Sequence, residues 1–154
     1  MPETALTPDE CTQAGSGTSW EHFHHVADVG IRGFGPTLGS AFEQAAKALT
    51  AAVTDPDTIR SSESIEISCQ APNPELLLVD WLNAIIFEMA TRKMVFGSFS
   101  VSISGNRLSA KICGEPIDVK RHAPATEVKG ATFSELEVAR GADGRWLAQC
   151  IVDV

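Results

Sequence analysis

Two negative charges meet at the end of this sequence. Asp153 is followed directly by Val154, whose main-chain carboxylate is also ionised at neutral pH. Adjacent negative charges repel each other unless something positive lies beside them. The pair therefore predicts a site that holds a cation. The alternative interpretation is a solvated aspartate at a strand end, which needs no partner.

A second carboxylate that could serve the same site is Asp28. It lies within residues 25–31, a largely apolar run whose composition is typical of a strand. An ionised group in such a run is costly unless it is paired or bound to a metal. Together, Asp28, Asp153 and the carboxylate of Val154 would supply the oxygen ligands that Ca²⁺ and Mg²⁺ prefer. We expect a divalent ion, with Ca²⁺ as the first choice.

The histidines and cysteines do not indicate a transition-metal site. His22, His24 and His25 crowd one short window, but successive side chains of an extended strand point to opposite sides. The 4 cysteines contain no C-x-x-C pair, so we predict neither a zinc knot nor a redox motif, and we expect reduced thiols. Neither a G-x-S-x-G motif nor a phosphate-binding P-loop is present. No nucleophilic set is therefore predicted.

These residues must be positioned by strands at both ends of the chain and by two helices between them. Hydrophobic periodicity predicts a strand over 26–34, whose glycines indicate an irregular edge or a tight bend, and a helix over 38–53. It further predicts a strand over 64–70, a helix over 74–89, strands over 99–103 and 108–113, and a terminal hairpin over 132–138 and 145–154. Thr37 and Asn73 have the residue types of N-caps for the two helices. The second helix is apolar on more than one stripe, which predicts a central, buried position.

The last strand predicts where the C-terminus lies. Its apolar side chains alternate up to the final residues, which fixes the end of the chain to the sheet. With strands dominating, the sequence predicts an α+β fold: a single two-layer domain of largely antiparallel sheet with two main helices. Residues 1–19 are predicted to form a flexible tail, and residues 20–154 the domain.

The amino-acid composition argues against two classes of binding partner, nucleic acids and membranes. The formal charge of -8 argues against direct binding of nucleic acid, which depends on clustered lysines and arginines. Lys120, Arg121 and Lys129 lie near one another in sequence, but such a spacing is more typical of a solvated loop. No apolar run is long enough to span a membrane, and the N-terminus lacks the basic residues of a signal peptide. We therefore expect a cytoplasmic protein without membrane contact.

Several short motifs resemble those of the archease family in their order and spacing. The resemblance runs from Trp20 to the C-terminus and rests on Trp20-Glu21-His22-Phe23, His25-x-Ala27-Asp28-Val29-Gly30-Ile31, Asp80-Trp81-Leu82-Asn83, Arg121-His122, Glu127-Val128-Lys129, Leu136-Glu137-Val138 and Val152-Asp153-Val154. Archeases are small acidic accessory proteins of the RtcB-type RNA ligase. That ligase joins RNA ends bearing a 2',3'-cyclic or 3'-phosphate to a 5'-hydroxyl.

The resemblance implies a function and a site. The chain is expected to promote guanylylation of the ligase's active-site histidine by GTP, and so multiple turnover, in tRNA splicing or RNA repair without being an enzyme itself. It also implies that Asp28, Asp153 and Val154 hold the divalent ion, and that His25 and Lys129 belong to the functional surface. Two alternatives remain open: a metal-dependent phosphoester hydrolase that activates water, and a general protein chaperone.

Overall fold

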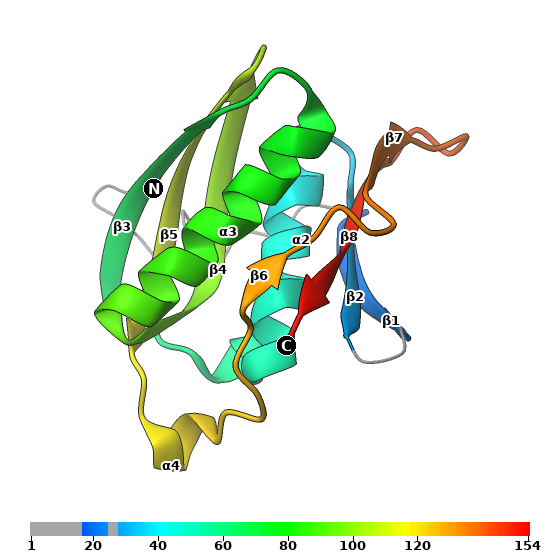
Figure 1. The fold of residues 1–154 in the computed structure, drawn as a ribbon. Helices are drawn as coiled ribbons and strands as arrows, with labels where there is room; N and C mark the ends of the chain where they lie inside the picture. The colour runs from blue at the N-terminus through cyan, green and yellow to red at the C-terminus, as the bar shows by residue number, and fades with distance from the viewer. Residues whose placement is uncertain (1–16, 25–27) are drawn as a thin grey trace.

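A computed structural model describes residues 17–24 and 28–154, which form two antiparallel sheets with helices packed against them (Figure 1). In chain order the elements are β1 (Ser19–His24), β2 (Val29–Gly35), α2 (Leu38–Val53), the 3-10 helix η1 (Pro56–Thr58), β3 (Glu63–Gln70), α3 (Pro74–Arg92), β4 (Met94–Ser104), β5 (Arg107–Pro116), α4 (Val119–His122), β6 (Gly130–Ala131), β7 (Glu137–Arg140) and β8 (Trp146–Asp153).

The two sheets share the helices between them. One sheet has 5 strands in the order β1-β2-β8-β6, with β7 also paired to β8, and the other has 3 strands in the order β3-β5-β4. Helix α2 packs against β2 of the first sheet and β4 of the second, while α3 covers the smaller sheet and reaches β6 (Figure 1). The predicted α+β class, with antiparallel strands and two main helices, is confirmed. The strands are divided between two sheets.

Both predicted N-caps are confirmed. The Thr37 hydroxyl accepts a hydrogen bond from the Ser40 N–H at 3.0 Å, and the Ser40 hydroxyl oxygen accepts one from the Thr37 N–H in return. Asn73 Oδ1 accepts a hydrogen bond from the Leu76 N–H at 2.9 Å, directly before Pro74. Each cap satisfies a backbone donor that the first helical turn leaves open, which is why the helices begin where they do.

The core is built around α3, as its apolar composition predicts. Trp81 is fully buried, and its indole N–H donates a hydrogen bond to the Phe42 carbonyl oxygen at 3.0 Å, which ties α3 to α2. The buried residues of α3 are Leu77, Leu78, Val79, Trp81, Leu82, Ile85 and Ile86. No helix in the described part of the chain is long and apolar enough to cross a bilayer.

The bend predicted at the glycines of the first strand is not present at Gly33. It lies within β2, and a Cβ atom placed on it would be 2.3 Å from the Ala45 nitrogen and 2.4 Å from the Ala41 carbonyl oxygen. These are backbone atoms of α2, so they have no rotamer that could relieve the overlap. The glycine is therefore required by close contact between helix and strand, and not by a turn.

The described cysteines differ in oxidation state. Cys69 and Cys150 are free thiols, as expected, whereas Cys113 is disulfide-bonded, so the expectation of reduced thiols is wrong at that position. Burial raises the pKa of the Cys150 thiol to about 12. Because the thiolate is the reactive form, Cys150 is a packing residue and not a nucleophile.

Candidate functional site

The two predicted aspartates lie at neighbouring ends of paired strands. Val29 of β2 pairs with Val152 of β8, so Asp28, which precedes the first, and Asp153, which follows the second, lie at the same end of this strand pair, an end that we call the charged edge. Asp28 is half-buried and forms a bend just before β2, and not inside a strand as predicted. Asp153 is exposed. The antiparallel register therefore brings together residues that are far apart in sequence.

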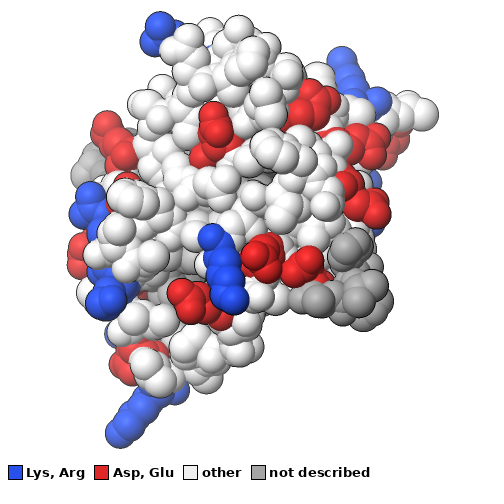
Figure 2. Space-filling model, viewed as in Figure 1, with Lys and Arg blue, Asp and Glu red and all other residues white. Residues whose placement is uncertain are grey.

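Lys129 reaches the same edge from the other side of β8. Its N–H donates a hydrogen bond to the Asp153 carbonyl oxygen at 2.7 Å, and the next residue, Gly130, pairs with Asp153 in β6. The side chains of Asp28, Asp153 and Lys129 have no hydrogen bond or ion pair to another described residue. In Figure 2 the face that carries the C-terminus shows acidic side chains grouped around a basic one. As far as the described residues go, these charged groups are available to a ligand or partner.

Val154 completes this edge. Its side chain is half-buried and packs against the core beside the fully buried Val152. Packing of the last side chain restrains the end of the chain, which would otherwise fray. That the main-chain carboxylate of Val154 serves as a ligand stays a prediction.

The oxygen atoms of the predicted site suit a hard cation. In the described part of the chain no three His, Cys, Asp or Glu side chains gather as metal ligands. The predicted site has a different composition: two aspartate side chains, Asp28 and Asp153, and one main-chain carboxylate. Such all-oxygen donors fit Ca²⁺ or Mg²⁺ and not zinc, which prefers nitrogen and sulfur.

The histidines have other roles where the structure describes them. The ring Nε2 of His22 lies 2.8 Å from the Ala48 carbonyl oxygen, to which it donates. His122 is buried and engaged with Glu115. His25, which we predicted for the functional surface, lies outside the described residues.

Asn83 is a positioning residue whose role the sequence left open. Its side-chain Oδ1 accepts a hydrogen bond from the Ala131 N–H at 2.9 Å, which joins α3 to β6. The sequence pattern allowed Asn83 either to face solvent or to present a polar group at the end of the core. The contact fixes the strand that begins directly after Lys129, so α3 helps to set the position of that lysine.

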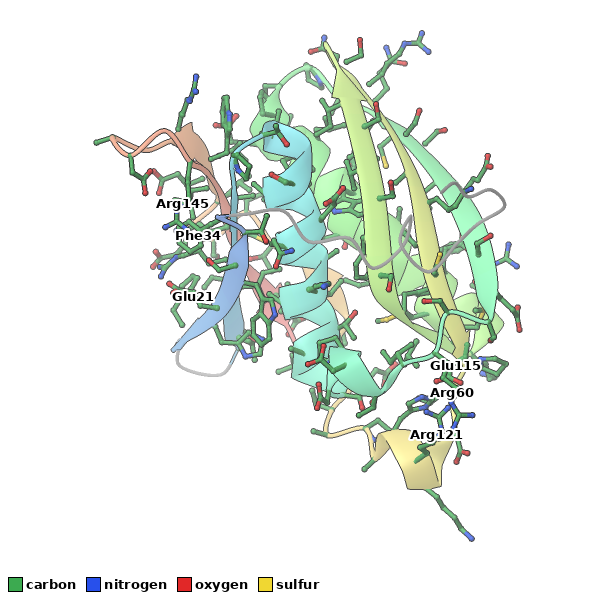
Figure 3. All side chains as sticks on the ribbon, turned by 180° about the vertical axis from the view of Figure 1, so that it is seen from behind. Glu21, Phe34, Arg60, Glu115, Arg121 and Arg145 are labelled. Atoms are coloured by element: carbon green, nitrogen blue, oxygen red, sulfur yellow. The ribbon has the colours of Figure 1, made fainter. Side chains whose placement is uncertain are left out.

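A buried ion-pair network anchors the segment that leads to Lys129. The Glu115 carboxylate lies 2.5 Å from an Arg121 nitrogen and 2.9 Å from His122 Nε2, and it accepts the Arg60 N–H at 2.9 Å. Since His122 Nδ1 accepts the Asp118 N–H at 2.8 Å, Nε2 carries the hydrogen and donates to Glu115. Figure 3 shows Glu115, Arg60 and Arg121 gathered beside α4.

This network also settles the role of Arg121. Its guanidinium is used within the protein, where it pairs with Glu115 and donates to the Thr58 carbonyl oxygen at 2.8 Å. Arg121 is therefore not part of a basic surface patch with Lys120 and Lys129. The sequence did not single out Glu115, because nothing in its neighbourhood shows that η1 and α4 converge on it.

Glu115 makes the stability of the fold dependent on pH. Burial alone would raise its pKa, but hydrogen bonds from Arg121, the Arg60 N–H and His122, with the Arg121 charge, lower the pKa from 4.5 to about 2. A lowered folded-state pKa means that the ionised group stabilises the fold above the unfolded pKa, and that this contribution is lost as pH falls toward the folded value. The window is therefore between pH 4.5 and about 2.

We expect Glu115→Gln to lower the free energy of unfolding by about 2 kcal/mol at pH 7, because it removes a charged hydrogen-bond acceptor. Urea unfolding of both proteins from pH 7 to pH 3 measures the effect. The difference should shrink below pH 4.5, where the wild-type carboxylate begins to take up its proton. A difference that stays constant with pH would show that Glu115 acts through shape alone. Glu63→Gln, at an exposed position of β3, is the control.

Comparison with known proteins shows the family of the chain. Residues 20–154 match the sequence profile of the archease protein family (MTH1598/TM1083). The chain belongs to the archease family. It is 37% identical over 139 residues to the archease of Thermococcus gammatolerans, covering 88% of this chain and 98% of that protein, and equally identical over the same shares to that of Pyrococcus furiosus.

Two solved structures have the same fold. Protein 1598 of Methanobacterium thermoautotrophicum, in solution, is 26% identical with a TM-score of 0.73, covering 88% of this chain and 99% of its own. A crystal structure from Thermotoga maritima, described as an archease and possible chaperone, is 17% identical with a TM-score of 0.56 and covers 86% of this chain and 94% of its own. The second likeness shows the fold alone.

Proposed function

We propose that this archease is a non-catalytic activator of an RtcB-type RNA ligase in the cytoplasm. It promotes guanylylation of the ligase's histidine by GTP, and so multiple turnover, in tRNA splicing or RNA repair. The observation that carries the proposal is the charged edge of the sheet, where the unpaired side chains of Asp28, Asp153 and Lys129 meet the end of the chain.

Family membership and charge support this division of labour. The Thermotoga maritima protein is described as a possible chaperone, a role that consists of acting on another protein. A helper with a formal charge of -8 does not compete with the ligase for RNA, because its field repels phosphates.

The residues of the edge have separate roles in the proposal. Asp28, Asp153 and the carboxylate of Val154 hold a divalent cation, with Ca²⁺ expected, and orient it toward the partner. When bound, the cation supplies a positive charge that can stabilise phosphate oxygens of the nucleotide. The main chain of Lys129 is held at this edge by the hydrogen bond of its N–H to the Asp153 carbonyl oxygen, and its ammonium offers a second cationic group there.

A ligation assay at limiting ligase tests the proposal. With GTP and an RNA in large excess, the ligase alone should stop after about one turnover, and addition of this protein should restore continued product formation. A chelator such as EGTA should remove the effect, and Ca²⁺ should restore it. Release of phosphate or nucleotide by this protein alone from phosphoester substrates would instead favour a hydrolase.

A further inference from the structure

An apolar pocket of about 340 Å³ lies beside the candidate site. It forms where the C-terminal half of α3 faces residues 123–129, a segment that we call the strap. Apolar side chains dominate its wall, among them Ile86, Met89, Met94, Ile117 and Val128. Its volume falls within the range of pockets that bury an organic group, and methionine side chains adapt to different shapes.

The pocket and the charged edge share a wall. The strap is held at one end by the Ala125 N–H, which donates to the Val53 carbonyl oxygen at 2.8 Å. At the other end the Lys129 N–H donates to the Asp153 carbonyl oxygen at 2.7 Å. Val128 turns into the pocket while Lys129 is exposed at the charged edge. A partner that contacts the edge therefore lies within one residue of the pocket.

Exposed apolar side chains also lie on α3 and on the segment after β6, outside the pocket itself. Ala90 lines the pocket and is exposed, and Phe87, one helical turn earlier, has 62% of its surface exposed. Phe133 is 68% exposed and lies two residues beyond Ala131, which is bound to Asn83 of the same helix. Figure 2 shows a broad uncharged area on this face. Exposed aromatic side chains around a pocket are typical of protein-binding surfaces.

The charges beside this surface indicate the chemistry of the occupant. Glu127 lines the pocket, and Asp153 and Asp28 lie at the adjoining edge beside Lys129. Lys93, the exposed C-cap of α3, adds a second cation beside the pocket, where its carbonyl oxygen accepts the Ile117 N–H. The protein as a whole carries a formal charge of -8. A second copy of this chain would bring like charges together, which opposes association, whereas a basic partner would be attracted.

We propose that the pocket, with Phe87 at its side, is a docking socket for a basic segment of a protein partner. A Phe, Leu or Met side chain of that segment enters the pocket, and a neighbouring Lys or Arg meets Glu127 and the acidic edge. In taking the partner to be the RNA ligase, this inference rests on the proposed function. The assignment of the socket itself rests on the pocket, its neighbours and their charge.

Matched variants at exposed positions test the socket. Phe87→Ala removes the exposed ring, and Ala90→Arg places a bulky cation at the pocket. Val119→Ala and Val119→Arg on α4 are the controls, because Val119 is 69% exposed and does not line the pocket. Calorimetric titration with the ligase should give a Kd at least about tenfold weaker for the first two variants, and changes within about twofold for the controls.

A probe that does not involve the ligase separates the two proposals. In methyl NMR spectra, the peptide acetyl-Lys-Phe-Arg-amide should shift the Met89 and Met94 signals, and the same peptide with Ala in place of Phe should not. Ala90→Arg should abolish the shifts. If the peptide binds there but the protein neither binds nor activates the ligase, the socket stands and the proposed function fails.

The opposite result overturns the socket alone. If Phe87→Ala and Ala90→Arg bind and activate the ligase like wild type, and the peptide shifts no pocket methyl, the socket is wrong and the proposed function stands. Sedimentation velocity tests whether a second copy of this chain occupies the pocket. A dimer of the wild-type protein that Ala90→Arg dissociates would show that a second copy fills the pocket, which would also overturn the inference.

Discussion

Asp153→Asn is expected to stop multiple-turnover ligation while leaving the fold unchanged. Asp153 is exposed, and its side chain forms no hydrogen bond or ion pair with a described residue, so the amide of nearly equal size replaces the carboxylate with little loss of packing. What changes is the charge at the edge where Asp28 and Lys129 also lie. Loss of one ligand from a site with few charged donors should weaken divalent-ion binding by at least about tenfold. Calorimetric titration with Ca²⁺ and the turnover assay measure the two effects.

Two controls distinguish a site from a general change of charge. Glu66→Gln removes one negative charge at an exposed position of β3, in the other sheet, and should leave ligation within about twofold of wild type. Two glycines added after Val154 displace the terminal carboxylate and should act like Asp153→Asn, whereas the same glycines before Met1 should have no effect. Normal turnover in both C-terminal variants would remove the charged edge from the mechanism.

The sequence could predict this edge because hydrophobic alternation determines which strand positions face the core. A register shift of one residue in β8 would turn Ala148, Cys150 and Val152 away from α2, so the pattern fixes the strand almost to its last residue. The apolar run around Asp28 likewise predicted a strand in that region. Which strands pair cannot be read from either pattern, so the link between the two aspartates rested on their charge, and the resemblance implied the same pair.

The contacts that hold the strap could not be predicted for a different reason. Glu115, His122 and Asn83 each act through a partner that another element brings close, such as the Arg60 N–H after η1 or the Ala131 N–H in β6. Residue type and local spacing carry no information about these partners. The bend at Asp28 could not be predicted for the same reason. It lies just before β2, where the pairing of β2 with β8 ends, and that pairing cannot be read from the local sequence.

Gly33→Ala is expected to have the largest effect on stability. The new Cβ would overlap the Ala45 nitrogen and the Ala41 carbonyl oxygen, so α2 must move away from β2 or the strand must distort. Overpacking against atoms that cannot change rotamer should cost about 3 kcal/mol, which corresponds to a Tm lowered by roughly 6 to 12 °C in a domain of this size. Urea unfolding followed by circular dichroism measures the change.

Gly141→Ala is the matched control for this substitution. It lies in the turn before β8, where a Cβ would meet the Asp143 side chain at 3.2 Å, and that side chain can move. Reduced freedom of the unfolded chain should then keep the change within about 1 kcal/mol. A Tm for Gly33→Ala within about 2 °C of wild type would mean that α2 does not rest on β2 as described. Because β2 leads directly from Asp28, a displaced strand should also weaken Ca²⁺ binding, whereas Gly141→Ala should not.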